Sequence, residues 1–402
     1  MGTTADLLVI GAGPAGTAAA ITAAGTGRRV VVVDRAEFPR DKTCGDGLTT
    51  GALRGLEALG VRLDDLGASA PVRDVVLVAP SGRQIRVPLP GHGQYARVMR
   101  RTDLDAALVE RAAASGAELE LGRAVTELKS QPDGVEATLA DGTVVAAPFA
   151  IAADGHYSTA RRLLAPHDPP VRGEWSAFRQ YFTGVDDPRL WVLFERDLLP
   201  GYAWVFPLPD GRANVGFGML RGTGGDRTVN GKVLARTWRD LLTRPLLRDI
   251  LGSRAEPESP HRAWPIPSHL DPARLAHGRV LFAGDAAGVV DPMTGEGIAQ
   301  AFETGVLAAH ATLDRAADPD VVATHYGAAV DRALGRDLRF AARLQRVLAH
   351  PRGAELALRI VDLTPWTRRN FARWMFEDYP RAILLTPDRW HRGMLAPPGA
   401  YS

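Results

Sequence analysis

The first 34 residues constrain the fold of this chain most strongly, because apolar runs alternate in them with a glycine-rich turn and a helix-forming stretch. Residues 6–10, DLLVI, have the composition of a short buried strand. GAGPAG follows at once, an alanine-rich stretch runs to about Gly25, and a second apolar run, VVVVD, ends at Asp34. This order predicts a βαβ unit of the Rossmann type.

The turn of this unit has the spacing GxGxxG, which is typical of dinucleotide binding. Its three glycines permit a tight turn, close approach of a pyrophosphate and close packing of helix on strand. The helix amino terminus favours negative charge, and a carboxylate at the end of the second strand can accept hydrogen bonds from a ribose. We therefore assign to the cofactor Gly11, Gly13, Pro14, Ala15, Gly16, Asp34 and Arg35.

A second glycine-rich segment, GDAAGVVDPMTGEGI at residues 284–298, ends the apolar run RVLFAGD. An aspartate at the end of a strand can hydrogen-bond a ribitol hydroxyl, and a helix amino terminus stabilises negative charge on a reduced flavin ring. Nicotinamide has no ribitol, so this segment predicts FAD. It adds to the cofactor site Gly284, Asp285, Pro292, Gly295, Gly297 and Ile298.

Two further segments are expected to reach the same crevice. ADGHYSTARRLL, residues 153–164, follows a strand predicted at VVAAPFAIAAD and brings Asp154 and Gly155 to the cofactor. Arg101 begins a helix predicted over residues 101–116, where its guanidinium can contact the pyrophosphate or the ribitol.

The chain of 402 residues is long enough for two or three lobes. Residues 166–274 contain alternating segments such as FRQYFTG, WVLFER, YAWVFPL and ANVGFGML, which predict an antiparallel sheet. We predict an α/β fold in which a Rossmann-type FAD-binding domain is interrupted by an antiparallel-sheet substrate domain and followed by a helical region. The predicted limits are 1–75, 98–165 and 275–325 for the FAD-binding domain, 76–97 and 166–274 for the substrate domain, and 326–402 for the helices.

Composition excludes several classes of function. A formal net charge of +2 is too small to indicate nucleic-acid binding. The single cysteine, Cys44, excludes an internal disulfide and a cysteine-based metal site, so we expect no metal. The predicted first strand begins within a few residues of the amino terminus, with no signal peptide before it, and no apolar run is long enough to span a bilayer. We expect a cytoplasmic protein.

The segments PRDKTCGDGL, at residues 39–48, and YAWVFP, at residues 202–207, bear on the chemistry. Cys44 lies close to Lys42 and directly before a Gly-Asp-Gly turn, which argues against burial in a strand or helix. Strand alternation places Tyr202, Trp204 and Phe206 on one face. Such an aromatic face suits an apolar substrate and excludes water, although aromatic residues of this spacing also form ordinary sheet core.

Together, GAGPAG, RTDLD, ADGHYS and AGDAAG resemble the hydroxylase-like FAD-dependent flavoproteins, and FPRDKTCGDGL, PGYAWVFPL and DPMTGEGIAQAFETG resemble the geranylgeranyl reductase family within them. The resemblance covers roughly residues 5–310. It implies that the CGDG segment lies near the isoalloxazine ring, with catalytic candidates Cys44, Gly45 and Asp46. It also implies a lipid pocket with Arg179, Tyr181, Tyr202, Trp204, Phe206 and Pro207. AWPIPSHLDPARLAHG departs from the glycine-rich stretch expected after the Ile-Pro pair.

The resemblance implies reduction of a prenyl-chain double bond, with a hydride from reduced FAD and a proton from Cys44 or a water that it orders. The chain has no second nucleotide fold, and GTGGD at residues 222–226 follows no convincing strand. We therefore expect electrons from transiently bound NAD(P)H or from a partner reductase. Arginines alternate with large apolar residues between 331 and 376, which fits either a membrane-surface helix or a helical lobe packed on the FAD domain.

Two other functions remain open on the same scaffold. One is an FAD-dependent monooxygenase or another tailoring enzyme. A halogenase would need a WxWxIP segment and a catalytic lysine, whereas this chain has WPIP at 264–267 and no lysine between residues 43 and 128. The other is a non-catalytic lipid or protein escort, against which the intact FAD motifs argue.

Overall fold

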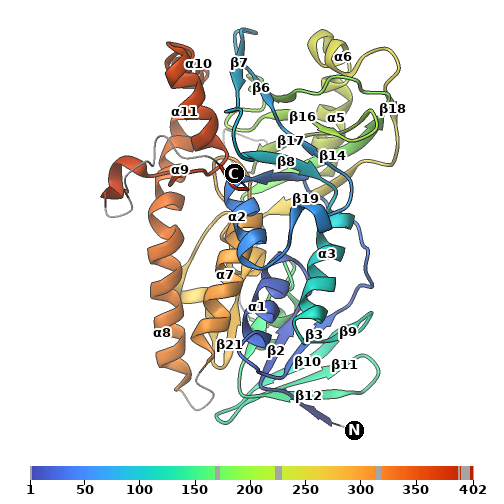
Figure 1. The fold of residues 1–402 in the computed structure, drawn as a ribbon, viewed down its shortest axis with the longest axis vertical. Helices are drawn as coiled ribbons and strands as arrows, with labels where there is room; N and C mark the ends of the chain where they lie inside the picture. The colour runs from blue at the N-terminus through green and yellow to red at the C-terminus, as the bar shows by residue number, and fades with distance from the viewer. Residues whose placement is uncertain are drawn as a thin grey trace.

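A computed structural model describes residues 2–167, 173–221, 229–313, 318–387, 390 and 399–401. In Figure 1 the sheet that contains β2, β3 and β21 lies below the sheet that contains β14, β16 and β17. Helices α8 to α11 run along one side of both sheets. The segment GTGGD lies outside the described residues.

The predicted βαβ unit is confirmed as β2 (Leu7–Ile10), α1 (Pro14–Ala24) and β3 (Val30–Asp34). It forms the centre of a six-stranded sheet with the order β20-β21-β13-β2-β3-β9. The other strands are β9 (Glu118–Leu121), β13 (Ala150–Ala152), β20 (Ala276–His277) and β21 (Val280–Phe282). All pair in parallel except β20, so the carboxyl ends of β2, β3, β13 and β21 meet at one edge.

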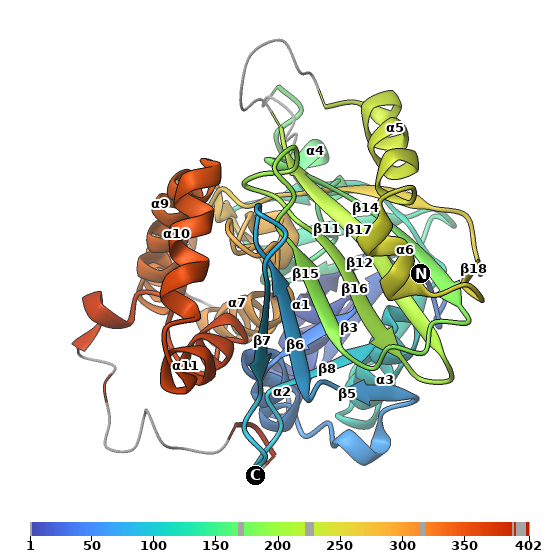
Figure 2. The ribbon, with the colours of Figure 1, turned by 90° about the horizontal axis from the view of Figure 1, so that it is seen from above.

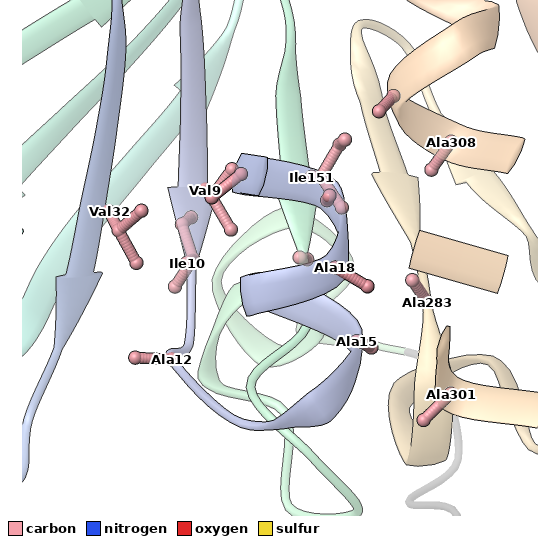
Figure 3. Close-up of a cluster of buried hydrophobic side chains, with 14 of the residues drawn as sticks. Val9, Ile10, Ala12, Ala15, Ala18, Val32, Ile151, Ala283, Ala301 and Ala308 are labelled. Atoms are coloured by element: carbon pink, nitrogen blue, oxygen red, sulfur yellow. The ribbon is translucent and has the colours of Figure 1, made fainter. Parts of the chain in front are cut away.

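Helix α1 packs on this sheet between α3 (Arg101–Ala114) and α7 (Ile298–Ala311). Small side chains dominate the contact, among them Ala15, Ala18 and Ala301, and they lie close to Val9 and Ile151 of the strands (Figure 3). Gly305 of α7 packs so closely on α1 that a Cβ there would overlap the carbonyl of Ala15. The many alanines of this region therefore permit two helices to lie close above the sheet.

The predicted strand VVAAPFAIAAD is wrong as a single element, because it divides into β12 (Val144–Ala147) and β13. Strand β12 belongs to a different sheet, with the order β1-β12-β11-β10, that packs beside β2. Its other strands are β1 (Gly2–Thr4), β10 (Val125–Ser130) and β11 (Val135–Leu139). A third sheet, β4-β8-β5, contains β4 (Gly47–Thr49), β5 (Ser69–Pro71) and β8 (Ala96–Met99). The short helices nearby are α2 (Thr50–Ala58) and α4 (Thr159–Leu164).

The second large sheet has the order β18-β14-β17-β16-β15-β6-β7, with β19 also paired to β14. Its strands are β6 (Asp74–Val78), β7 (Gln84–Pro88), β14 (Trp175–Thr183), β15 (Leu190–Leu193), β16 (Ala203–Leu208), β17 (Arg212–Leu220), β18 (Glu256–Pro257) and β19 (Arg262–Ile266). The predicted antiparallel sheet is confirmed apart from one pairing, because β15 runs parallel to β6. This sheet joins strands from both sides of residues 98–165 in the chain.

The two faces of this sheet have different covers, as Figure 2 shows from above. Val205 and Phe217 face α5 (Gly231–Leu241) and α6 (Pro245–Leu251), two helices that the sequence prediction of an all-sheet region missed. Trp204 and Phe206 face the opposite way, in one apolar cluster with side chains of α10 and α11. Alternate residues of YAWVFP therefore pack into two different hydrophobic cores, one on each face of the sheet.

The carboxyl-terminal segment is helical, as predicted, where the structure describes it. Helix α8 (Pro319–Val330) continues through a π-helical turn, Asp331–Gly335, into α9 (Arg336–Leu348). Helices α10 (Pro351–Val361) and α11 (Pro365–Met375) then fold back against the second large sheet. None of the helices in the described part of the chain is long and apolar enough to cross a bilayer.

Candidate active site

A cavity of about 430 Å³ lies between the carboxyl ends of the parallel strands and the second large sheet. Most of the predicted site residues line it: Gly11, Gly13, Pro14, Ala15, Asp34, Arg35, Cys44, Gly45, Arg101, Asp154, Gly155, Tyr202, Trp204, Phe206, Gly284, Asp285, Gly295, Gly297 and Ile298. Six predicted residues do not line it: Gly16, Asp46, Arg179, Tyr181, Pro207 and Pro292. In the described part of the chain, no cluster of three or more potential ligands could hold a metal ion.

The glycine-rich turn closes one end of this cavity. Gly11 adopts a left-handed φ of 103°, and a Cβ built at Gly16 would lie 1.8 Å from the carbonyl oxygen of Gly11. Only glycine fits either position. Asp34 accepts a hydrogen bond from the backbone N–H of Ala12 at 2.7 Å, so its carboxylate is held at the mouth of the turn.

Arg101 is held on the cavity wall by a buried ion pair. Its Nε and Nη2 atoms each donate to a carboxylate oxygen of Asp105 at 2.8 Å, and Arg40 adds a contact to Asp105 at 3.2 Å. Burial alone would lower the pKa of Arg101, but the Asp105 carboxylate raises it above its ordinary value. The guanidinium is therefore a fixed positive charge beside the cavity and near the Cys44 thiol.

The opposite side of the cavity is formed by residues that follow β13 and β21. Asp154 accepts a hydrogen bond from the backbone of Ala160 through Oδ2, whereas its buried Oδ1 has no partner among the described residues. Asp285 lies in a short 3-10 helix, Gly284–Ala287, and α7 begins only at Ile298. Lys42 lies 3.9 Å from the Asp285 carboxylate and 4.4 Å from the centre of the Trp264 ring.

These features fit FAD. No side chain among the described residues caps α1 at Gly13 or α7 at Gly297, and both helix starts line the cavity. Free N–H groups at such ends attract a pyrophosphate and the electron-rich edge of a reduced flavin. The uncapped helix starts, the fixed Arg101 charge and the unpartnered Asp154 oxygen are the groups that an elongated dinucleotide needs.

The CGDG turn forms the wall between the cavity and the second large sheet. Cys44 is half-buried there, and burial raises the pKa of its thiol while Arg101 opposes that shift. Asp46 is fully buried behind the turn at a left-handed φ of 64°. It accepts hydrogen bonds from the Tyr181 hydroxyl at 2.7 Å and from the Asn214 amide at 2.9 Å. Asp46 therefore holds the turn in place and does not face the cavity.

The second large sheet contributes the aromatic side of the cavity. Tyr202, Trp204 and Phe206 lie on one face of the sheet, as predicted, and the Tyr202 hydroxyl donates to the carbonyl of Thr294. The Trp204 indole donates to Asn214 at 3.0 Å, and the Asn214 amide donates in turn to the carbonyl of Cys44 at 2.8 Å. The aromatic face and the CGDG turn are thus one hydrogen-bonded unit.

Three of the six predicted residues that do not line the cavity make contacts outside it. Arg179 is buried and pairs with Asp41 at 2.5 Å. The ring of Tyr181 lies between the guanidinium groups of Arg100 and Arg179, at 4.4 and 4.0 Å, on the far side of the CGDG turn. Pro292 turns its carbonyl to the indole of Trp175 at 3.1 Å.

The structure also brings to the site residues that sequence reasoning missed. Lys42 and Glu296 line the cavity, and Asn214 supports it. Lys42 and Glu296 each lie inside a recognised motif, so their positions were a usable signal. Asn214 had no such signal, since only the pairing of β16 with β17 brings it beneath the CGDG turn.

Comparison with known proteins places this geometry in a family. The profile of the FAD binding domain matches residues 4–180. The menaquinone reductase of Mycolicibacterium smegmatis is 35% identical over 380 residues, which cover 88% of this chain and 86% of the relative. Digeranylgeranylglycerophospholipid reductase 1 of Methanopyrus kandleri is 33% identical over 329 residues, covering 79% of this chain and 83% of the relative.

Solved structures share the fold. A geranylgeranyl bacteriochlorophyll reductase-like protein from Thermoplasma acidophilum superposes with a TM-score of 0.78 at 22% identity, covering 96% of this chain and 98% of that one. The halogenase PltM superposes with a TM-score of 0.70 at 17% identity, covering 93% of this chain and 83% of that one. Both likenesses concern the fold alone. The cavity, its uncapped helix ends and the two relatives above 30% identity show that this chain is an FAD-dependent oxidoreductase and belongs to the geranylgeranyl reductase family.

Proposed function

We propose that this enzyme saturates carbon–carbon double bonds of a prenyl chain, in a geranylgeranyl lipid or a menaquinone side chain, with a hydride from reduced FAD. The observation that carries the proposal is the aromatic face of Tyr202, Trp204 and Phe206, which lines the same cavity as the start of α7 and Cys44. The names of the reductase relatives support it. A monooxygenase is the alternative, which a likeness in fold to a probable FAD-dependent monooxygenase from Pseudomonas aeruginosa favours.

The chain's own residues have four tasks in this reaction. Cofactor binding falls to the glycine-rich turn, Arg101 and the start of α7, and FAD when bound supplies the hydride. The aromatic face excludes water and aligns one double bond. An isolated alkene accepts a hydride poorly, so a proton must reach its second carbon in the same stage, and the Cys44 thiol is one group that can deliver it.

We assign Asp46, Tyr181 and Arg179 to positioning. Their contacts with one another, with Asn214 and with Asp41 support a role in holding the CGDG turn against the cavity. We further propose that electrons come from transiently bound NAD(P)H or from a partner reductase.

The experiment that tests the function starts with anaerobic reduction of the bound flavin. Geranylgeranyl diphosphate or a prenylated quinone is then added, and the products are analysed by mass spectrometry. A product that gains pairs of hydrogen atoms is the expected result. No product until oxygen is admitted, followed by gain of an oxygen atom, would assign the enzyme to the monooxygenases instead.

We also propose that the enzyme meets its substrate at a membrane surface, through the outer face of α10 and the start of α11. Helix α10 is apolar on two sides. Ala354, Leu358 and Val361 are buried, whereas Leu356 and Ile360 on the opposite side and Leu363 just beyond the helix are 59%, 53% and 69% exposed. A helix that is apolar on both sides needs a second apolar neighbour.

Charge favours a lipid surface as that neighbour. Residues 343–373 contain seven arginines against two acidic residues, in a chain whose whole net charge is +2. Trp366, at the start of α11, is 57% exposed. Arginines around an apolar stripe with a tryptophan at its edge suit anionic headgroups, whereas two copies of this positive surface would repel each other.

The position of this face also suits delivery of a lipid. The inner side of α10 belongs to the same apolar cluster as Trp204 and Phe206, which line the cavity. This shared cluster links the helix proposed to meet the lipid to two side chains of the cavity wall.

Vesicle sedimentation tests this surface. The enzyme should bind phosphatidylglycerol vesicles better than phosphatidylcholine vesicles, and a variant with serine at 356, 360, 363 and 366 should lose binding. Serine at the exposed Leu313 and Val321 is the matched control, which should still bind. Equal binding by both variants would contradict the proposal, as would a fall in oligomeric state in the first variant, since that would mean that a second copy covers the face.

A further inference from the structure

Glu296 lies in the loop before α7, between two residues assigned to the cofactor. Its side chain lines the cavity on the side of the CGDG turn and the aromatic face. A Cβ built on Gly47 of that turn would lie 3.6 Å from Glu296 Oε1 and 3.4 Å from the ring of Phe206. The carboxyl group therefore faces the part of the cavity where the apolar substrate is expected.

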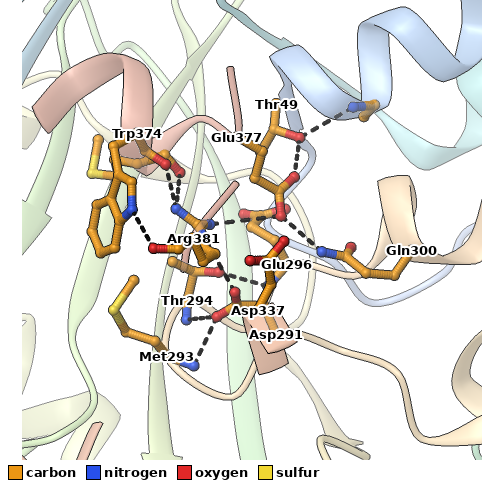
Figure 4. A network of polar contacts seen from close by, with 12 residues as sticks. Thr49, Asp291, Met293, Thr294, Glu296, Gln300, Asp337, Trp374, Glu377 and Arg381 are labelled. Carbon is orange, nitrogen blue, oxygen red and sulfur yellow. Dashed lines mark hydrogen bonds and ion pairs between the residues drawn. The ribbon is translucent and has the colours of Figure 1, made fainter. Parts of the chain in front are cut away.

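The charged neighbours of Glu296 are Asp291, from the same loop, and Glu377 and Arg381, from one other segment, and they contact one another (Figure 4). Arg381 contacts Asp291 at 3.1 Å and Glu377 at 3.6 Å. Glu377 accepts hydrogen bonds from Thr49 at 2.6 Å and from Gln300 at 2.7 Å. Within the described residues, the Glu296 carboxyl has no hydrogen bond and no ion pair.

This environment keeps the carboxyl neutral. Burial and the negative charges of Glu377 and Asp291 raise the pKa of Glu296 to about 8, and Arg381 only partly opposes them. Cys44 and Tyr202 face the same space, and burial raises the pKa of each above its ordinary value. Glu296 is therefore the strongest acid that still holds its proton at neutral pH on this side of the cavity.

Resting on the proposed reduction of a prenyl double bond, we propose that Glu296 is the acid that protonates the substrate. The hydride of the reduced flavin forms a C–H bond at one alkene carbon as the π bond breaks. The second carbon takes the proton of the Glu296 carboxyl, whose O–H bond breaks. The flavin is left oxidised and Glu296 is left as a carboxylate, which solvent reprotonates before the next turnover.

The test compares E296Q, E296D and C44A with the wild type. E296Q should slow substrate reduction by roughly 10²–10⁴-fold, and E296D should restore part of the rate. Because the donor must be protonated, the wild-type rate should fall as the pH rises through about 8, and E296Q should lack that fall. C44A should keep it. E377Q removes a neighbouring negative charge, so it should move the fall to lower pH.

A measurement without turnover accompanies these rates. Infrared difference spectra of the flavin-free and the flavin-loaded protein should contain a carboxylic-acid band that disappears near pH 8 in the wild type and is absent in E296Q. An unchanged rate and pH profile in E296Q would overturn the proposal, as would a band that does not titrate there. If E296Q reduces substrate normally while C44A does not, Cys44 is the donor. Failure of the wild type to reduce any prenyl substrate, with the band intact, would instead overturn the proposed function.

Discussion

Replacement of Asp46 by asparagine should make the enzyme more stable at neutral pH, although Asp46 lies in the most diagnostic motif of the chain. The side chain is fully buried, and burial raises its pKa to about 6 from an unfolded value of 3.8, against the hydrogen bonds of Tyr181 and Asn214 that lower it. The folded protein therefore holds the proton more tightly than the unfolded chain.

The sign follows from that difference. The contribution of a group with a raised pKa is fully present below pH 3.8 and is lost as the pH rises through about 6. Two pKa units correspond to about 3 kcal/mol. Asparagine cannot ionise, and its oxygen can accept both hydrogen bonds that Oδ2 now accepts. The free energy of unfolding of D46N should therefore not fall as the pH rises through this range. Its amide nitrogen replaces Oδ1, which is buried and unpartnered, and this change adds an offset that does not vary with pH.

Denaturant unfolding of the flavin-loaded wild type and D46N across this pH range measures the effect. The difference in the free energy of unfolding should grow by about 3 kcal/mol between the acidic and neutral ends. D46A is the control, because it leaves the Tyr181 hydroxyl without Asp46 and the Asn214 amide with only the Cys44 and Trp204 contacts, and it should be less stable at every pH. A difference between D46N and wild type that stays flat with pH would refute the reasoning. Retained reductase activity in D46N would support a positioning role, and its loss would support a chemical one.

Three further substitutions test the site. Gly16→Ala should abolish flavin binding, because its Cβ would lie 1.8 Å from the Gly11 carbonyl oxygen, and flavin retained through gel filtration would contradict this. Arg101→Ala leaves the buried Asp105 carboxylate with Arg40 alone, and should lower the free energy of unfolding by about 3–5 kcal/mol. R101K should recover little of this stability, because lysine cannot donate two parallel hydrogen bonds to the carboxylate. An Arg101→Ala variant as stable as the wild type would show that the ion pair is dispensable. Cys44→Ala alters the cavity wall, so it should slow prenyl reduction less than E296Q does while the flavin spectrum stays unchanged, and a larger loss than in E296Q would make Cys44 the donor.

The sequence predicted those helices and strands that are determined by residues close together in the chain. The βαβ unit could be predicted because the spacing of apolar residues changes from that of a strand to that of a helix and back again. The glycines between them mark a turn that other residues cannot form. The aromatic face was readable because strand alternation alone places Tyr202, Trp204 and Phe206 together. The predictions that failed were those that depend on distant partners. VVAAPFAIAAD divides between two sheets, and α5 and α6 interrupt the all-sheet region.

The site divides in the same way. The sequence by itself determined the cofactor, because glycines, a helix start and a strand-end carboxylate lie next to one another in the chain. Only the tertiary structure decided which side chains face the substrate. Asp46 turns behind its own motif because Tyr181 and Asn214, more than 130 residues away, bind it there. The pKa of Glu296 is raised because the side chain is buried near the carboxylates of residues 377 and 291, which together outweigh the opposing charge of Arg381. Burial and charge are sums over neighbours in space, and no local pattern of residues contains them.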